Sequence, residues 1–284
     1  MTCYIDQMLR LGLLWAVLLL GAGMVVFSVQ GAIERGRVSR SRLRAFARRH
    51  RLTITVDNGN RVIRYLATTR RWRTTGLVAG LLGSVGWAWW QGGLQFTFLP
   101  LFAGWFVGAL VAEVRLARTS FGTRRAASIE SRSPSLYLPR TAWWLGPALA
   151  VASVAGAGYA WARTGVWEPT VWLLAGAAVV IAVVVNRVQA RVVGRPQPAE
   201  APDVVAADDA IRSRSLHVLT GGGVTLVVYC VLGQLAAAAH LFGEAGDTMQ
   251  GVVVVGSLIF PIMGWAMATA KWDVIRSTTE IESW

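Results

Sequence analysis

Charged residues are scarce in this chain. Asp, Glu, Lys and Arg make up 15% of its 284 residues, whereas an ordinary soluble domain carries about 25%. Hydrophobic residues account for 54%, and the mean hydropathy is +0.48. This composition excludes an ordinary soluble domain and predicts an all-α integral membrane protein.

Cysteine and lysine are also rare. The two cysteines, Cys3 and Cys230, support neither a disulfide framework nor a CxxC site, and the single lysine, Lys271, is too near the end of its run for a retinal linkage. The sequence holds no Cys, His, Asp or Glu cluster with zinc spacing, no P-loop and no GxGxxG. We therefore predict no catalytic residue, no metal site and no cofactor.

Seven apolar runs are long enough to cross a membrane. A bilayer core of about 30 Å needs roughly 20 apolar residues in a helix. Residues 91–93 alone join the second run to the third, which indicates a tight hairpin; a re-entrant pair is the alternative. The sequence thus predicts a seven-helix transmembrane bundle forming a single transmembrane domain, with spans at 11–29, 74–90, 94–112, 141–162, 169–186, 216–242 and 249–270.

The basic residues predict the orientation of these spans. Of the 28 basic residues, 26 lie in alternate connections, and cytoplasmic connections are the ones that carry excess Arg and Lys. Only Arg10 and Arg163 fall on the other side, so the N-terminus is predicted outside and the C-terminus inside. Because basic residues follow the first run more than they precede it, we expect an anchor rather than a signal peptide. The predicted cytoplasmic segments are 30–73, 113–140, 187–215 and 271–284.

This placement also decides what the net charge of +13 means. Binding to nucleic acid requires a basic surface on a soluble or tethered domain. Here the cations lie between hydrophobic spans, so no nucleic-acid partner is predicted. Contact with anionic membrane lipid is the simpler use of such charges.

Small residues spaced four apart allow close helix packing in lipid. They predict a compact bundle packed within one chain, although the same motif also permits a homodimer. Pro261 interrupts the last span and is a candidate hinge. The small-residue motifs are Gly76 and Gly80; Gly104, Gly108 and Ala112; Ala148, Ala152, Gly156 and Ala160; Gly233 and Ala237; and Gly264 and Ala268.

The predicted span cores contain no Asp, Glu, Lys or Arg, which argues against a proton-coupled transporter and a diacid protease. One catalytic alternative pairs Ser257 with His240 as nucleophile and base of an intramembrane hydrolase. Their different depths in the membrane argue against that pair. Ser153, Thr225 and Gln234 are further polar residues within the spans.

The first cytoplasmic segment is the richest in arginine. From Arg35 to Arg51 a thin apolar stripe among many arginines predicts an interfacial helix between the first two spans. A second helix is expected to start at Asp57 or Asn58 and to run into the second span, with a hairpin at Asn58-Gly59 as the alternative. Residues 194–209 are expected to form a flexible linker. The candidate residues for contact with lipid or a partner are Arg42, Arg44, Arg48, Arg49, Arg51, Arg70, Arg71 and Arg73.

Two sequence segments carry a resemblance to known proteins. They are residues 64–73 (RYLATTRRWR), followed by a Gly-rich span, and residues 136–140 (LYLPR). They resemble uncharacterised multi-span proteins of GC-rich bacteria, some of them encoded beside ABC-transporter ATPases. An interfacial helix before six spans is also similar to ABC-2 exporter permeases, although the extra first span and its orientation depart from that pattern. The resemblance implies a permease-like or accessory subunit.

The sequence therefore predicts a multi-pass protein of the bacterial plasma membrane that serves a transport system, with the ABC type as the candidate, without being an enzyme itself. Its expected partners are membrane lipid and a cytoplasmic ATPase or another membrane subunit. Two alternatives remain, a membrane sensor or scaffold that binds a cytoplasmic regulator, and the intramembrane hydrolase.

Overall fold

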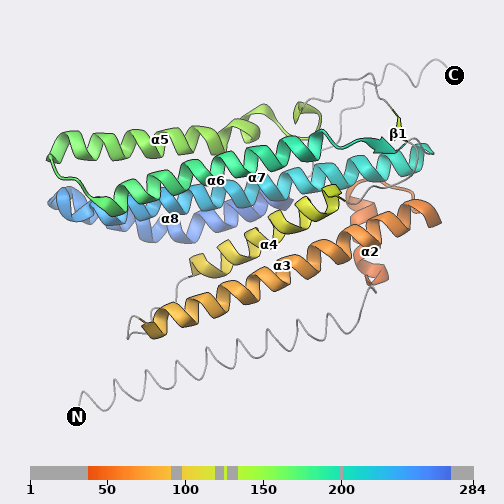
Figure 1. The fold of residues 1–284 in the computed structure, drawn as a ribbon, viewed down its shortest axis with the longest axis horizontal. Coiled ribbons are helices and arrows are strands. Elements are labelled where there is room, and N and C mark those ends of the chain that lie inside the picture. The colour runs from red at the N-terminus through yellow and green to blue at the C-terminus, as the bar shows by residue number, and fades with distance from the viewer. Residues whose placement is uncertain (1–37, 91–97, 119–124, 127–133, 199–200, 270–284) are drawn as a thin grey trace, which may run out of the picture. The chain divides into compact units, whose positions relative to one another are not determined.

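The computed structural model describes residues 38–90, 98–118, 125–126, 134–198 and 201–269. Helices dominate these residues, and the chain divides into two compact units (Figure 1). Unit 1 comprises residues 1–46 and 55–118, and unit 2 comprises residues 47–54 and 119–284. The predicted first span, 11–29, the predicted hairpin at 91–93 and the predicted C-terminal segment, 271–284, lie outside the described residues. So do residues 94–97 of the third predicted span and residues 119–124 and 127–133 of the segment 113–140.

Five helices are long and apolar enough to cross a membrane. This finding confirms the all-helical class and is consistent with a membrane protein. The second predicted span, 74–90, forms the latter half of the helix α3 (Val56–Trp90), whose glycines and tryptophans keep it less apolar than the five. The five are α4 (Phe98–Arg118), α5 (Arg140–Thr164), α6 (Pro169–Val193), α7 (Pro202–Ala238) with its short continuation, and α8 (Glu244–Thr269).

The Arg-rich stretch forms a helix, α2 (Arg40–Arg49), as predicted, but α3 starts earlier than expected. The backbone N–H of Thr55 donates to Asn58 Oδ1 at 2.9 Å, and the N–H of Asn58 donates to Thr55 Oγ1 at 3.3 Å. This reciprocal pair is a capping box, in which Thr55 rather than Asp57 or Asn58 is the N-cap. The alternative hairpin at Asn58-Gly59 is wrong, because both residues lie within α3.

In unit 1, α3 and α4 pack side by side through the predicted glycines (Figure 1). A Cβ atom added to Gly104 would overlap the carbonyl oxygen of Gly76, and one added to Gly108 would overlap the carbonyl oxygen of Trp72. Gly80 lies against the Pro100 carbonyl in the same way. The backbones touch directly, so the small residues are required here for the approach itself.

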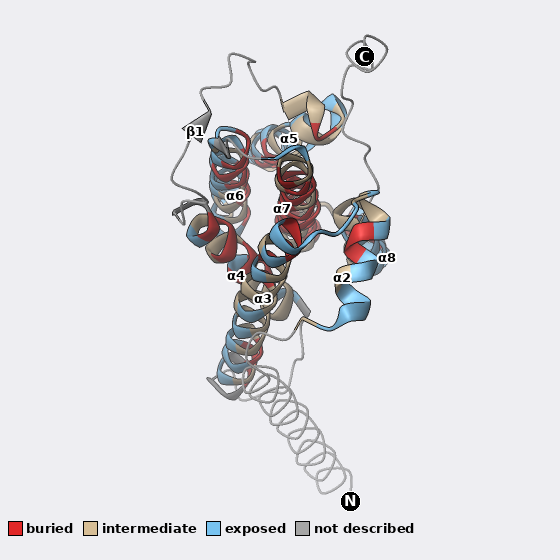
Figure 2. Ribbon diagram, turned by 90° about the vertical axis from the view of Figure 1, so that its right-hand side faces the viewer, coloured by how far each residue is buried: buried red, intermediate tan, exposed pale blue. Residues whose placement is uncertain are grey.

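In unit 2, α7 is the central helix and packs against α5, α6 and α8. Buried residues occur along almost its whole length. Figure 2, which views α7 nearly end-on, shows much of it as buried. Short elements link the helices. They are the two-residue strands β1 (Arg125–Ala126) and β2 (Gln197–Pro198), which pair antiparallel, and the 3₁₀ turns η1 (Pro134–Leu136) and η2 (Ala239–Leu241).

Some small-residue motifs of unit 2 form helix contacts, and others lie on the exposed surface. Gly264 packs so closely against Thr225 and Gly221 that a Cβ atom would overlap them. The motif on α5 does not pack as predicted: Ala148, Ala152 and Gly156 are exposed. The buried face of α5 consists of Ala150, Ser153, Ala157 and Ala160.

The flexible linker predicted at 194–209 is wrong over its second half, because α7 begins at Pro202. Proline suits the first turn of a helix, where its missing N–H would have no intrahelical partner. At about 1.5 Å per residue, the 37 residues of α7 extend about 55 Å, well beyond a bilayer core of about 30 Å. The first turns of α7 therefore lie on the Arg-rich side of the predicted span.

Candidate functional site

Two polar contacts cross the interior of unit 2. In the first, the Ser153 hydroxyl on α5 donates to Gln234 Oε1 on α7 at 2.6 Å. Gln234 Nε2 in turn donates to the carbonyl oxygens of Val171 on α6 at 3.0 Å and of Ser153 at 3.2 Å. Ser153 and Gln234, which the sequence analysis named as separate polar residues, are thus in contact. The side-chain amide of Gln234 on α7 is hydrogen-bonded to both α5 and α6.

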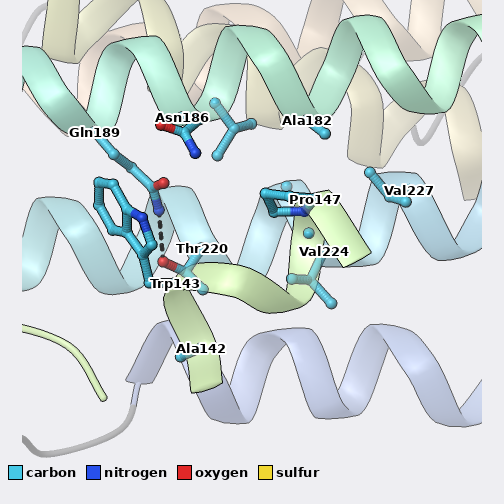
Figure 3. A pocket seen from close by; sticks show the side chains of 12 residues that line it. Ala142, Trp143, Pro147, Ala182, Asn186, Gln189, Thr220, Val224 and Val227 are labelled. Carbon is cyan, nitrogen blue, oxygen red and sulfur yellow. Dashed lines mark hydrogen bonds between the residues drawn. The ribbon is translucent and has the colours of Figure 1, made fainter. Parts of the chain in front are cut away.

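The second contact joins α6 to α7 nearer their other ends. Gln189 Nε2 donates to Thr220 Oγ1 at 2.7 Å, and the Thr220 hydroxyl donates to the Leu216 carbonyl at 2.8 Å. Figure 3 shows Gln189 and Asn186 extending from α6 toward Thr220. These residues line a narrow, partly open pocket between α5, α6 and α7.

A proline shapes the apolar wall of this pocket. Pro147 lies inside α5 and has no N–H to give to the carbonyl of Trp143, four residues earlier, and both residues line the pocket (Figure 3). In a membrane helix such a carbonyl is commonly satisfied by a neighbouring group or an ordered water. The pocket has room for about one water molecule and is too narrow for a larger ligand.

Pro261 leaves a similar carbonyl in α8, and here a partner is present. The hydroxyl of Tyr229 on α7 donates to the Ser257 carbonyl at 3.3 Å. The helix runs on to Thr269, so the role of Pro261 as a hinge stays a prediction.

The hydrolase alternative finds no support in this geometry. Ser257 Oγ donates to the Val254 carbonyl at 2.8 Å, and His240 is exposed in η2, just before α8 begins. Ser257 lies 13 positions after Glu244, which places its hydroxyl about 20 Å along α8 from that end. Within the described residues, no three His, Cys, Asp or Glu side chains gather where they could hold a metal ion.

Arg212, in the N-terminal part of α7, is fully buried. Its guanidinium pairs with Asp208, one turn earlier, at 2.7 Å, and donates to the carbonyls of Val193 at 3.0 Å and Pro196 at 3.1 Å. Val193 is the last residue of α6, so the cation meets the negative end of that helix. Asp209, which follows Asp208 in α7, accepts a hydrogen bond from the Tyr137 hydroxyl at 3.0 Å.

The predicted contact arginines fall into exposed and half-buried groups. Arg49 is half-buried, and burial lowers the pKa of its guanidinium below the usual value, with the nearby charge of Arg214 lowering it further. One turn earlier on α2, Phe46 is buried and its ring lies 6.4 Å from that of Tyr65. The exposed members of the set are Arg42, Arg44, Arg48, Arg51 and Arg71, and the half-buried ones are Arg49, Arg70 and Arg73.

Two arginine–tryptophan pairs connect α3 to α4 in unit 1. The guanidinium carbon of Arg73 lies 5.5 Å from the ring centre of Trp105, and that of Arg115 lies 4.2 Å from the ring centre of Trp72. Each pair joins a cation on one helix to a ring on the other, which is the geometry of a cation–π contact.

Aromatic residues also gather at the turn between α5 and α6. The rings of Trp167 and Trp172 stack at 4.9 Å, and Trp161 meets Trp167 edge-on at 6.5 Å. Tryptophan rings grouped at the ends of two long apolar helices are typical of a membrane–water interface.

These features define a class, a helical protein with several helices of membrane-spanning length. Comparison with family models, curated proteins and solved structures gave no match for this chain. The resemblance to uncharacterised multi-span proteins of GC-rich bacteria therefore stays a prediction.

Sequence reasoning missed three of these features. Gln189 was counted with a cytoplasmic segment, although it lies in α6 and bonds across to Thr220. Arg212 carried no sign of its burial. Arg115 could have been paired with Trp72, because Gly104 and Gly108 on α4 and Gly76 and Gly80 on α3 already suggested that these helices touch.

Proposed function

We propose that this chain is a seven-span protein of the bacterial plasma membrane, with its N-terminus outside and its C-terminus in the cytoplasm. In this proposal it acts as a permease-like or accessory subunit of an ATP-driven transport system, and its Arg-rich cytoplasmic surface contacts lipid and an ATPase. The interior helices form the passage or support a neighbouring subunit.

The feature that carries the proposal is the exposed face of α2. Arg40, Arg44 and Arg48 recur every four residues and are all exposed, so they form one row along the helix. Phe46, on the opposite face, is buried and anchors the helix. A rigid cationic row beside the membrane suits either an anionic lipid surface or an acidic patch on a protein partner.

Site-specific crosslinking in living cells tests the proposal. A photoreactive amino acid replaces Arg44 on α2, and the full-length protein is then purified and its crosslinked partners identified by mass spectrometry. We expect a stoichiometric cytoplasmic ATPase, because the row on α2 faces the cytoplasm in this topology.

The matched control carries the same photoreactive group at Val166, an exposed residue in the turn between α5 and α6 on the predicted outer side. That position should not capture the ATPase. Capture of lipid alone at Arg44 would overturn the transport-subunit proposal. Capture of a regulator without ATPase motifs would replace it with the sensor or scaffold alternative.

A further inference from the structure

The pocket between α5, α6 and α7 has a backbone carbonyl in its α5 wall. Pro147 has no N–H, so the carbonyl of Trp143 lacks the donor that a regular helix would supply. A proline ring inside a helix meets the carbonyl four residues earlier, and the Pro147 ring lines the pocket (Figure 3). The Trp143 carbonyl therefore lies beside the pocket and can accept a hydrogen bond from within it.

The α6 wall of the same pocket carries two side-chain amides. Asn186 and Gln189 are three residues apart, so they lie on one face of α6. Gln189 is buried, and its Nε2 atom donates to Thr220, whereas its Oε1 atom accepts no hydrogen bond from a described residue. The half-buried amide of Asn186 likewise forms no hydrogen bond within the described part of the chain. Polar groups held away from bulk water in this way favour a bound partner.

This part of α5 has no direct polar link to its neighbours. The hydrogen bond between Ser153 and Gln234 lies further along the helix, and residues 140–150 form no side-chain hydrogen bond to α6 or α7 among the described residues. The pocket has room for about one water molecule. A buried water usually makes about two to four hydrogen bonds to groups that would otherwise be unsatisfied, and the Trp143 carbonyl and the two amides supply them.

We propose that this pocket binds a single water molecule that joins α5 to α6 at Pro147. The water donates its two hydrogen atoms to the Trp143 carbonyl and to Gln189 Oε1, and it accepts one hydrogen bond from the Asn186 amide. Each of these groups then has a partner, and the bond that proline removes from α5 is replaced by a link to α6. The inference goes beyond the proposed function, because it depends on the packing of unit 2 and not on any transport partner.

Nuclear magnetic resonance of the full-length protein in mild detergent tests for this water. The chain has three asparagines, Asn58, Asn60 and Asn186, so ¹⁵N-asparagine labelling gives three side-chain amide signals. Cross-relaxation with water, measured at mildly acidic pH where amide exchange is slow, separates long-lived bound water from surface water. The Asn186 amide should contact a long-lived water, and the variant Asn186→Leu assigns its signal.

Asn60 is the matched control, because it is exposed on α3. Its amide should show only brief contacts with surface water. The same brief contacts at Asn186 would overturn the proposal, since the pocket would then hold no bound water molecule.

A double-mutant cycle tests which groups hold the water. Pro147→Ala supplies the missing N–H, so the Trp143 carbonyl no longer depends on the pocket. In the parent protein, Asn186→Leu should lower the equilibrium constant for folding by about fivefold, the usual effect of losing one buried hydrogen bond. In the Pro147→Ala background the same substitution should have a clearly smaller effect. Titration with sodium dodecyl sulfate, followed by circular dichroism, measures both changes.

Pro261→Ala is the control for the cycle. Pro261 lies in α8 and does not line the pocket, and the carbonyl that it leaves open already accepts a hydrogen bond from Tyr229. The effects of Pro261→Ala and Asn186→Leu should therefore be additive. The bridge is wrong if Asn186→Leu is equally costly with and without Pro147, or if it couples as strongly to Pro261→Ala.

The test stays decisive if Pro147→Ala is unstable, because the spectra of the parent protein alone show whether Asn186 contacts a long-lived water. Crosslinking at Arg44 is independent of these measurements. A negative result in the pocket therefore counts against this site and not against the proposed function.

Discussion

Arg212 is a buried cation whose guanidinium has partners on both α7 and the end of α6. The carboxylate of Asp208 compensates its charge, and the carbonyls of Val193 and Pro196 accept its remaining donors. Because these carbonyls lie at the end of α6 and just beyond it, the guanidinium does for α6 what a C-terminal cap would do. A single side chain on α7 thereby satisfies carbonyl oxygens at the end of α6.

Replacing Arg212 by methionine should lower the free energy of unfolding by about 2–4 kcal/mol, because it leaves one carboxylate and two carbonyls without donors. Thermal denaturation in detergent, followed by circular dichroism, measures the change. Arg191→Met is the control, since Arg191 is exposed near the end of α6, and it should change the free energy by less than about 0.5 kcal/mol. Equal destabilisation by both variants would contradict the capping role.

Helix pairs in this protein are joined in two different ways. The α3–α4 pair relies on direct backbone contact through Gly76, Gly104 and Gly108. The three helices α5, α6 and α7 instead share the amide of Gln234 and the hydrogen bond between Gln189 and Thr220. Close van der Waals packing and interhelical hydrogen bonds are the two forces available to helices in lipid.

Gly104→Ala should separate α3 from α4, because the added methyl group overlaps the Gly76 carbonyl. We expect a loss of about 1–3 kcal/mol, the usual cost of overpacking. Unfolding by titration with sodium dodecyl sulfate, followed by tryptophan fluorescence, gives the value. Gly83→Ala on α3 meets open space and should be neutral or stabilising by up to about 1 kcal/mol. A loss at Gly83 as large as that at Gly104 would refute the contact.

At the scale of the whole molecule, two of the described helices, α3 and α7, are longer than a bilayer with its headgroups, which is about 40–45 Å thick. α3 has 35 residues and α7 has 37, or about 52 and 55 Å at about 1.5 Å per residue. Each continues without a break from an Arg-containing portion into an apolar portion. In the proposed topology both portions rich in arginine extend into the cytoplasm.

Cysteine labelling checks that orientation. In a chain whose Cys3 and Cys230 have been replaced, Val166→Cys should react with a membrane-impermeant maleimide on intact spheroplasts, because the turn after α5 is predicted outside. Ser41→Cys on α2 should react only after the membrane is permeabilised. Both positions are exposed, so access within the protein does not limit either reaction. The opposite pattern would invert the proposed topology.

Long apolar runs were predictable from sequence because they are local. The spans predicted at 141–162 and 169–186 lie within α5 and α6, whose ends are marked by Pro139 and Arg140, Gly165 and Pro169. The start of α3 was placed too late, since Thr55 caps it only through a bond to a residue three positions on.

Features that depend on another helix could not be predicted in this way. From sequence alone, Pro202 was assigned to a linker. In the structure it begins α7, and the buried Arg212 of that helix bonds to the end of α6. The small residues on α5 have the same spacing as those on α3 and α4, yet Ala152 and Gly156 face outward. Spacing identifies a surface that allows close approach, and only the neighbouring helix decides whether it is used.

The glycine contact between α3 and α4 also bears on how the protein is made. Its residues lie between positions 72 and 108, so both sides of the contact have been synthesised while the ribosome is still adding α5 to α8. N-terminal units generally fold first during synthesis, and the short connection keeps the entropy of closure small. A substitution that parts these helices therefore acts on the nascent chain at the translocon, and its first sign in the cell should be a lower yield of inserted protein.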